Sequence, residues 1–265
     1  MNIHEYIAFT NENEKPLDHL VDSYSCTSIF RKIAFIGDSL SSGEFETRDA
    51  EGNPGYHDLY EYSWGQYIAR QNGLTAYNFS RGGMTAKWYL DSFADENDLW
   101  NKEKACQAYV IALGVNDLYN INMELGSIAD VDVGNYKNNK PTFAGYYGQI
   151  ISRYKEISPD AKFFFVTFPN TLRGDEYRDV TIGMVKLLQD FAEKFDNSYV
   201  INLYEYGPRY DEAFVDQYHL YGHLNATGYI LTAKMIDSYI DYIIRHNPQD
   251  FKTVPFINTG IPYKV

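Results

Sequence analysis

The stretch Ile33-Ala34-Phe35-Ile36-Gly37-Asp38-Ser39-Leu40 decides the fold class. Its first four residues form a short apolar run, which is typical of a strand buried on both faces of a parallel sheet. Gly37 then lets the backbone turn sharply and present the hydroxyl of Ser39 at the carboxyl end of that strand. In an open α/β sheet, ligands bind at this edge. Taken alone, the motif also fits an ordinary turn with a helix-capping serine.

Four more apolar runs follow along the chain, and segments with helical periodicity separate them. The runs lie at residues 76–79, 108–113, 163–168 and 199–203. Helices are predicted at about 64–71, 143–157, 175–195 and 226–246, where capping residues and apolar stripes fit. This alternation of strands and helices predicts an α/β domain with a five-stranded parallel sheet.

The length of 265 residues allows a single domain with a sizeable core. We expect one domain over residues 1–265, with its core at about 32–246. Residues 1–31 and 247–265 are predicted to be extensions that wrap this core. The polar connection at about 119–140 is long for a compact domain, so it is predicted to be a lid or binding loop.

The charge balance narrows the range of partners. The formal net charge is −13, which argues against non-specific binding of nucleic acid and against docking on anionic lipid. The sequence has neither a recognisable signal peptide nor a membrane-length apolar run. Cys26 and Cys106 show no spacing typical of a disulfide framework or a metal site, so we expect two reduced thiols and a cytoplasmic location.

Three further motifs follow the later apolar runs. Residues 78–83 end in two glycines, which let the backbone approach a ligand closely. Residues 113–117 place the amide of Asn116 after the next run, and an amide is a neutral donor suited to a developing oxyanion. Residues 216–229 supply a carboxylate and two imidazoles. Each motif alone also fits a turn or a helix cap.

In this order, the four motifs resemble those of the GDSL-type serine esterases, the SGNH hydrolase superfamily. The resemblance spans about residues 32–246. It implies that Ser39 is the nucleophile, that Gly83 and Asn116 help to hold the oxyanion, and that His223 is the base. It also implies a flavodoxin-like three-layer α/β/α fold, no cofactor, and hydrolysis of small acyl esters.

The chemistry of these side chains agrees with that resemblance. A serine hydroxyl is a poor nucleophile until a neighbouring imidazole accepts its proton. The oxyanion would then be held by the N–H groups of Ser39 and Gly83 and by the amide of Asn116.

The last motif departs from the family pattern, in which an aspartate stands three residues before the histidine. His223 is followed by the expected residues, and Asn225 can cap the final helix, but Leu220 stands three residues before it. Asp216 stands three residues before His219 instead. We therefore favour His223 as the base and keep His219 as the alternative. Asp216 or a backbone carbonyl is expected to orient the ring.

Metal and nucleotide sites are not supported. His219 and His223 have the spacing of a metal-binding pair, but no glutamate follows His219, and Gly222 argues against a helix there. No glycine belongs to a phosphate-binding loop or to a dinucleotide fingerprint. The sequence therefore predicts neither a metal nor a cofactor.

The aromatic content suggests a substrate class. Tyrosine suits clefts that stack on sugars, although core packing also accounts for tyrosines. The candidates near the motifs are Tyr56, Tyr60, Tyr62, Trp64, Trp88, Tyr89 and Tyr119. We expect a short acyl ester as substrate, with acetylated carbohydrate favoured. The alternatives are an acyltransferase with the same machinery and a carbohydrate-binding protein that has lost turnover. The sequence predicts no oligomeric state.

Overall fold

The computed structural model describes residues 11, 13–171 and 175–263. Its central sheet has five parallel strands in the order β4-β1-β5-β6-β7. They are β1 (Lys32–Gly37), β4 (Thr75–Ser80), β5 (Ala108–Ala112), β6 (Lys162–Val166) and β7 (Ser198–Ile201). All five predicted strands are confirmed. Numbered by sequence within the sheet, the order is 2-1-3-4-5, which is the flavodoxin-like arrangement.

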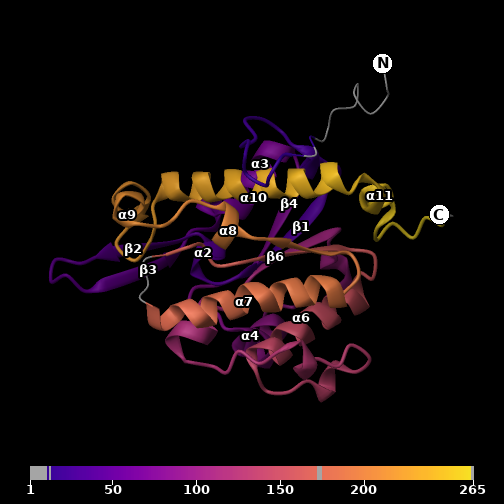
Figure 1. The fold of residues 1–265 in the computed structure, drawn as a ribbon, viewed down its shortest axis with the longest axis horizontal. Helices are drawn as coiled ribbons and strands as arrows, with labels where there is room; N and C mark the ends of the chain where they lie inside the picture. Colours follow the sequence, from indigo (N-terminus) through magenta and orange to yellow (C-terminus); the bar gives the residue numbers. More distant parts are fainter. Residues whose placement is uncertain (1–10, 12, 172–174, 264–265) are drawn as a thin grey trace.

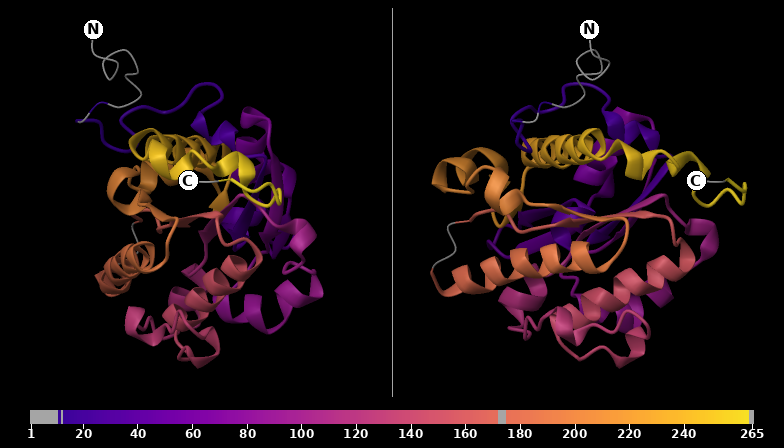
Figure 2. Two further views of the ribbon diagram at one scale, coloured as in Figure 1. Left: turned by 90° about the vertical axis from the view of Figure 1, so that its right-hand side faces the viewer. Right: turned by 45° about the vertical axis from the view of Figure 1, so that its right-hand side comes forward.

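Helices cover both faces of this sheet, so the fold has the three predicted layers (Figures 1 and 2). The helices α3 (Trp64–Asn72) and α10 (Ala226–His246) cover one face. The other face is covered by α4 (Ala86–Trp88), α6 (Phe143–Ile157) and α7 (Asp175–Lys194).

The predicted caps explain where the helices begin. The side chains of Ser63, Thr142 and Asn225 accept hydrogen bonds from the first turns of α3, α6 and α10. Such caps satisfy N–H groups that have no partner within the helix.

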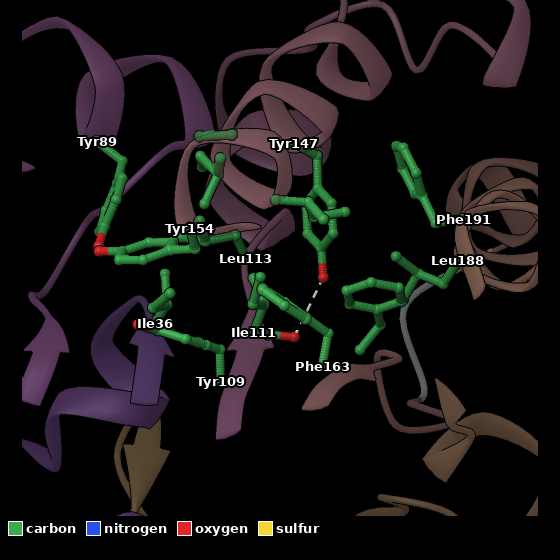
Figure 3. Packing of buried hydrophobic residues seen from close by; sticks show 14 of the residues in the cluster. Ile36, Tyr89, Tyr109, Ile111, Leu113, Tyr147, Tyr154, Phe163, Leu188 and Phe191 are labelled. Carbon is green, nitrogen blue, oxygen red and sulfur yellow. Dashed lines mark hydrogen bonds between the residues drawn. The ribbon is translucent and has the colours of Figure 1, made fainter. Parts of the chain in front are cut away.

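The apolar run of β1 is explained by burial on both sides. Ile33 and Phe35 pack on the face beneath α3 and α10, whereas Ala34 and Ile36 pack on the opposite face. Successive side chains of a strand point to opposite faces, so a strand between two helical layers is apolar at nearly every position. On the α6 side, the hydroxyl of Tyr147 donates to a main-chain carbonyl of β5, at 3.2 Å (Figure 3).

Shorter elements connect this framework. Two antiparallel hairpins were not predicted: β2 (Glu44–Arg48) with β3 (Pro54–Asp58), and β8 (His219–Leu220) with β9 (His223–Leu224). The short helices are η1 (Cys26–Ile29), α2 (Ser39–Ser42), η2 (Tyr60–Tyr62), η3 (Tyr89–Phe93), α5 (Ala94–Glu96), η4 (Lys102–Lys104), η5 (Asn116–Asn120), η6 (Ile128–Asp130), η7 (Tyr136–Asn138), α8 (Leu203–Tyr206), α9 (Glu212–Tyr218), α11 (Pro248–Phe251) and η8 (Val254–Phe256).

The described parts of both extensions pack on the core. The main-chain N–H of Cys26 donates to Asp241 of α10, and Phe251 packs against Phe164 of β6. The connection predicted to be a lid or binding loop lies mainly along α6, where Val131 contacts Gly148. A side chain at position 148 would collide with this valine, so the glycine permits the close approach.

Candidate active site

The turn after β1 places Ser39 at the carboxyl edge of the sheet. Gly37 leaves no room for a side chain, because a Cβ there would collide with Ser41. Asp38 caps α2 by accepting a hydrogen bond from the N–H of Leu40, at 3.1 Å. Ser39 is the first residue of α2, where a main-chain N–H has no partner within the helix. Its N–H is therefore available to an oxyanion.

The strands on either side of β1 bring the second and third motifs to the same edge. Gly37 is in register with Ser80 of β4 and Ala112 of β5, so the turns that follow these strands meet. Gly83 has a φ of +72°, a left-handed conformation that glycine adopts without strain. The structure thus collects at one edge the residues predicted to hold the oxyanion.

Asn116 is held in place by two hydrogen bonds. Its Nδ2 donates to the main-chain carbonyl of Met84 at 3.0 Å, and its Oδ1 accepts from Nδ2 of Asn120 at 2.7 Å. An amide nitrogen carries two hydrogens, so one donor remains for an oxyanion.

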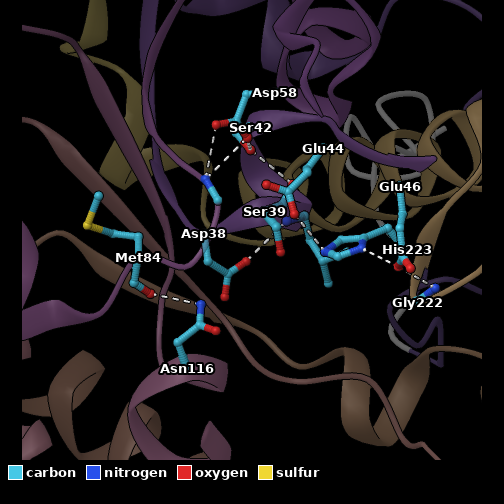
Figure 4. Close-up of polar contacts among 12 residues, drawn as sticks. Asp38, Ser39, Ser42, Glu44, Glu46, Asp58, Met84, Asn116, Gly222 and His223 are labelled. Carbon is cyan, nitrogen blue, oxygen red and sulfur yellow. Dashed lines mark hydrogen bonds and ion pairs between the residues drawn. The ribbon is translucent and has the colours of Figure 1, made fainter. Parts of the chain in front are cut away.

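His223 lies in β9, which contacts α2. Two carboxylates flank its ring (Figure 4). Nε2 lies 3.0 Å from Oε1 of Glu44, and Nδ1 lies 3.5 Å from Oε2 of Glu46. Both glutamates come from β2, two positions apart, so their side chains leave the same face of the hairpin. The ring of Tyr56 meets that of His223 edge-on, with centroids 5.8 Å apart.

Glu46 is a buried carboxylate with several partners. Its side chain is 5% exposed, and it forms an ion pair with Arg48. Its Oε2 accepts a hydrogen bond of 2.9 Å from the N–H of Gly222, the residue before His223. This bond ties β2 to the hairpin that carries His223.

Glu44 lies on the other side of the ring, between His223 and the glycine turn after β4. A Cβ on Gly82 would collide with Oε2 of Glu44, so glycine at position 82 makes room for this carboxylate. The same turn is tied to β3, because the N–H of Gly82 donates to both carboxylate oxygens of Asp58, at 3.2 Å each.

The other two predicted site residues, Asp216 and His219, line a cavity together with Leu40 and Gly222. Asp216 is exposed on α9 and forms no ion pair with His223 within the described part of the chain. The ring of His219 contacts Tyr210 and Phe214, with centroids 6.1 Å from each. The sequence did not predict Glu44 and Glu46 as partners of His223, because their approach depends on a contact between β2 and β9, which are far apart in the chain.

Burial and charge shift several pKa values at the site. Burial alone would lower the pKa of His223, but Glu44 and Glu46 outweigh it, so this pKa is raised. Burial raises the pKa values of Asp38 and Asp117 to about 7 each. Burial, aided by the nearby His223, lowers the pKa of His219.

Among the described residues, we find no group of three or more His, Cys, Asp or Glu side chains that could hold a metal ion. None of the described helices combines the length and apolar character that a membrane span requires.

A comparison with protein-family models identifies the chain. The model of the GDSL-like lipase/acylhydrolase family matches residues 35–231, which is more than half of the chain. The chain belongs to this family. The protein is thus a GDSL-type hydrolase, and family membership supports esterase activity. A search of curated proteins found no significant match.

Solved structures support the GDSL-type fold. A family two carbohydrate esterase from Clostridium thermocellum, in complex with cellohexaose, is 18% identical; the match covers 89% of this chain and 66% of that one, with a TM-score of 0.57. A family 3 carbohydrate esterase from the same organism is 16% identical, with coverages of 82% and 98% and a TM-score of 0.52. A protein from Desulfitobacterium hafniense described as lipolytic and of the G-D-S-L family is 15% identical, with coverages of 78% and 98% and a TM-score of 0.51.

Proposed function

We propose that this GDSL-type hydrolase is a serine esterase for short acyl esters, with Ser39 as nucleophile and His223 as base. The observation that carries the proposal is that Ser39, Asn116 and His223 lie at one edge of the sheet (Figure 4), where the turn that contains Gly83 also follows β4. Nucleophile, base and oxyanion donors in one place are the parts that acyl transfer requires.

In the proposed acylation step, His223 accepts the hydroxyl proton of Ser39 as Oγ attacks the ester carbonyl carbon. The N–H groups of Ser39 and Gly83 and the amide of Asn116 stabilise the tetrahedral oxyanion. The intermediate then expels the alcohol, whose oxygen takes the proton from His223. Water attacks the acyl-enzyme in the same way, releasing the carboxylic acid and restoring Ser39.

We assign the orienting carboxylate to Glu46. It faces Nδ1, leaving Nε2 for the serine, which is the division of roles in a Ser-His-acid triad. The contact is long and is not a hydrogen bond in the present structure. Catalytic hydrogen bonds of free enzymes often tighten only with bound substrate. Asp216, the acid expected from the sequence, is the alternative that variants can test.

We assign a different role to Glu44, whose carboxylate contacts Nε2 of His223. Its carboxylate stabilises the protonated ring in the free enzyme and raises the pKa of His223. It must release Nε2 for the ring to accept the proton of Ser39. Glu44 therefore sets the pH range in which the base is available.

For the alcohol part of the substrate, we propose a carbohydrate, and for the ester an acetyl or another short acyl group. Similar folds occur in carbohydrate esterases, and Tyr56 lies exposed beside His223. Of the other aromatic candidates, Trp64 and Tyr89 are buried in the core and cannot stack on a sugar.

The test is a panel of p-nitrophenyl esters of increasing acyl length, together with acetylated sugars, assayed on the wild type and on Ser39→Ala. We expect hydrolysis by the wild type and none above background by the variant. Addition of an acceptor alcohol distinguishes an acyltransferase, which would form a new ester instead of free acid. If no ester reacts and no serine-directed reagent labels the protein, the proposal fails and a binding protein without turnover is favoured.

A further inference from the structure

An apolar cavity of about 390 Å³ lies beside the proposed nucleophile. This volume is within the range of about 300–1,000 Å³ that is usual for small-molecule sites. Its apolar wall includes Leu40, Val115, Phe168, Pro169, Val215 and Leu224. These residues come from α2, from the turns after β5 and β6, from α9 and from β9, so the fold assembles the cavity from five separate segments.

Four residues of the cavity wall are sequence neighbours of the proposed reacting groups, and two of them, Gly222 and Leu224, flank His223. Leu40 directly follows Ser39, and Val115 directly precedes Asn116. An acyl carbon attacked by Ser39, with its oxygen held by Asn116, would therefore adjoin the cavity at Leu40 and Val115. A smaller cavity of about 60 Å³ also has Leu40 and Val115 in its wall and reaches the buried Trp64.

The part of the site that β2 and β3 form is polar. There the hairpin of β2 and β3 presents Glu44, Tyr56 and Asp58, which offer hydrogen-bond acceptors and an exposed ring. Such groups suit the hydroxyls of an alcohol, whereas the cavity suits a hydrocarbon chain. An ester with a hydrocarbon acyl chain and a polar alcohol would match the cavity with its acyl half and the hairpin with its alcohol half.

We propose that the cavity binds the acyl group of the substrate and that this group is an uncharged hydrocarbon chain longer than acetyl, in the range from butyryl to octanoyl. This inference rests on the proposed esterase function and specifies its substrate. An acetyl group would leave most of the cavity to water. Each further methylene that it buries favours the ester by about fourfold.

Two carboxylates limit the charge of this chain. Glu212 and Asp216 lie in the wall of the cavity and are exposed on α9. They would repel an acyl chain that ends in a carboxylate. An uncharged chain is therefore favoured over an ω-carboxy chain of the same length.

The experiment compares kcat/KM for p-nitrophenyl acetate, butyrate, hexanoate and octanoate, and for the hexanoate analogue with a terminal carboxylate. A second series keeps acetyl and lengthens the alcohol. We expect kcat/KM to rise about fourfold per methylene from acetate to hexanoate, the ω-carboxy ester to be at least about tenfold poorer than hexanoate, and no comparable rise with the alcohol.

Two matched variants connect the preference to the cavity. Val215→Asp puts a charge into the wall at a position that is 38% exposed in the free protein, so the change is compatible with folding. We expect it to lower the ratio of hexanoate to acetate turnover by about tenfold. Val133→Asp makes the same change at a position 45% exposed and outside the cavity, and it should leave this ratio unaltered.

Three results would overturn the inference. One is a preference for acetate or for the ω-carboxy ester. Another is a kcat/KM that increases with the length of the alcohol and not with the length of the acyl chain. The third is an equal effect of Val215→Asp and Val133→Asp. In each case, continued hydrolysis and labelling of Ser39 would leave the esterase proposal standing, whereas loss of both would overturn the function itself.

Discussion

Nδ1 of His223 lies 3.5 Å from Oε2 of Glu46, a residue that precedes it in the chain by more than 170 positions. The same carboxylate oxygen accepts a hydrogen bond from the N–H of Gly222. One buried glutamate thus contacts both the ring of His223 and the backbone that carries it. The hairpin of β2 and β3, inserted between the serine motif and the next strand of the sheet, supplies this carboxylate.

Glu46→Gln and Asp216→Asn form a matched pair of variants that tests the orienting acid. A neutral amide at position 46 can still accept the hydrogen bond from Gly222, but it cannot stabilise the imidazolium that forms during catalysis. We expect Glu46→Gln to lower kcat by about 10²–10⁴, with the fold preserved by circular dichroism. Asp216→Asn should remain within about threefold of the wild type. If Asp216→Asn lowered kcat more than Glu46→Gln, Asp216 would be the carboxylate that orients His223.

The pH dependence tests the role of Glu44. Protonated His223 cannot accept the serine proton, so kcat/KM should increase as pH rises through its pKa. Glu44 and Glu46 raise that pKa. Glu44→Gln removes one negative charge, so the acid limb of the pH profile should move to lower pH. An unchanged limb, or one moved to higher pH, would contradict the assignment.

His223→Ala and His219→Ala separate the two candidate bases. His223→Ala should lose nearly as much activity as Ser39→Ala, since nucleophile and base act as a unit. His219→Ala should lose far less, because that ring packs against Tyr210 and Phe214. Steady-state kinetics on one ester provides the comparison, and an inactive His219→Ala beside an active His223→Ala would reverse the assignment.

Asn116→Ala tests the oxyanion hole. An oxyanion donor acts mainly in the transition state, so we expect kcat to fall by about 10²–10³ with little change in KM. The loss of its hydrogen bond to Met84 should be checked by thermal unfolding. An effect confined to KM would instead make Asn116 a substrate-binding residue.

Local patterns explain what the sequence predicted well. The strand before Ser39 and the caps at Ser63, Thr142 and Asn225 depend on neighbouring residues, and the structure confirms these elements. The carboxylates beside His223 depend on a contact between distant hairpins, for which a single sequence gives no register. The sequence does not reveal the apolar cavity for the same reason, because residues from five separate segments form it. Composition also could not distinguish the buried Trp64 from the exposed Tyr56.

The nucleophile is the central claim, and labelling with a fluorophosphonate tests it most directly. Intact-mass measurement of the full-length protein, followed by peptide mapping, gives the number and position of adducts. The account predicts one adduct, on Ser39, with none on Ser39→Ala and strongly slowed labelling of His223→Ala, because the imidazole activates the hydroxyl. An adduct on another residue, or an unlabelled wild-type protein that still hydrolyses esters, would contradict it.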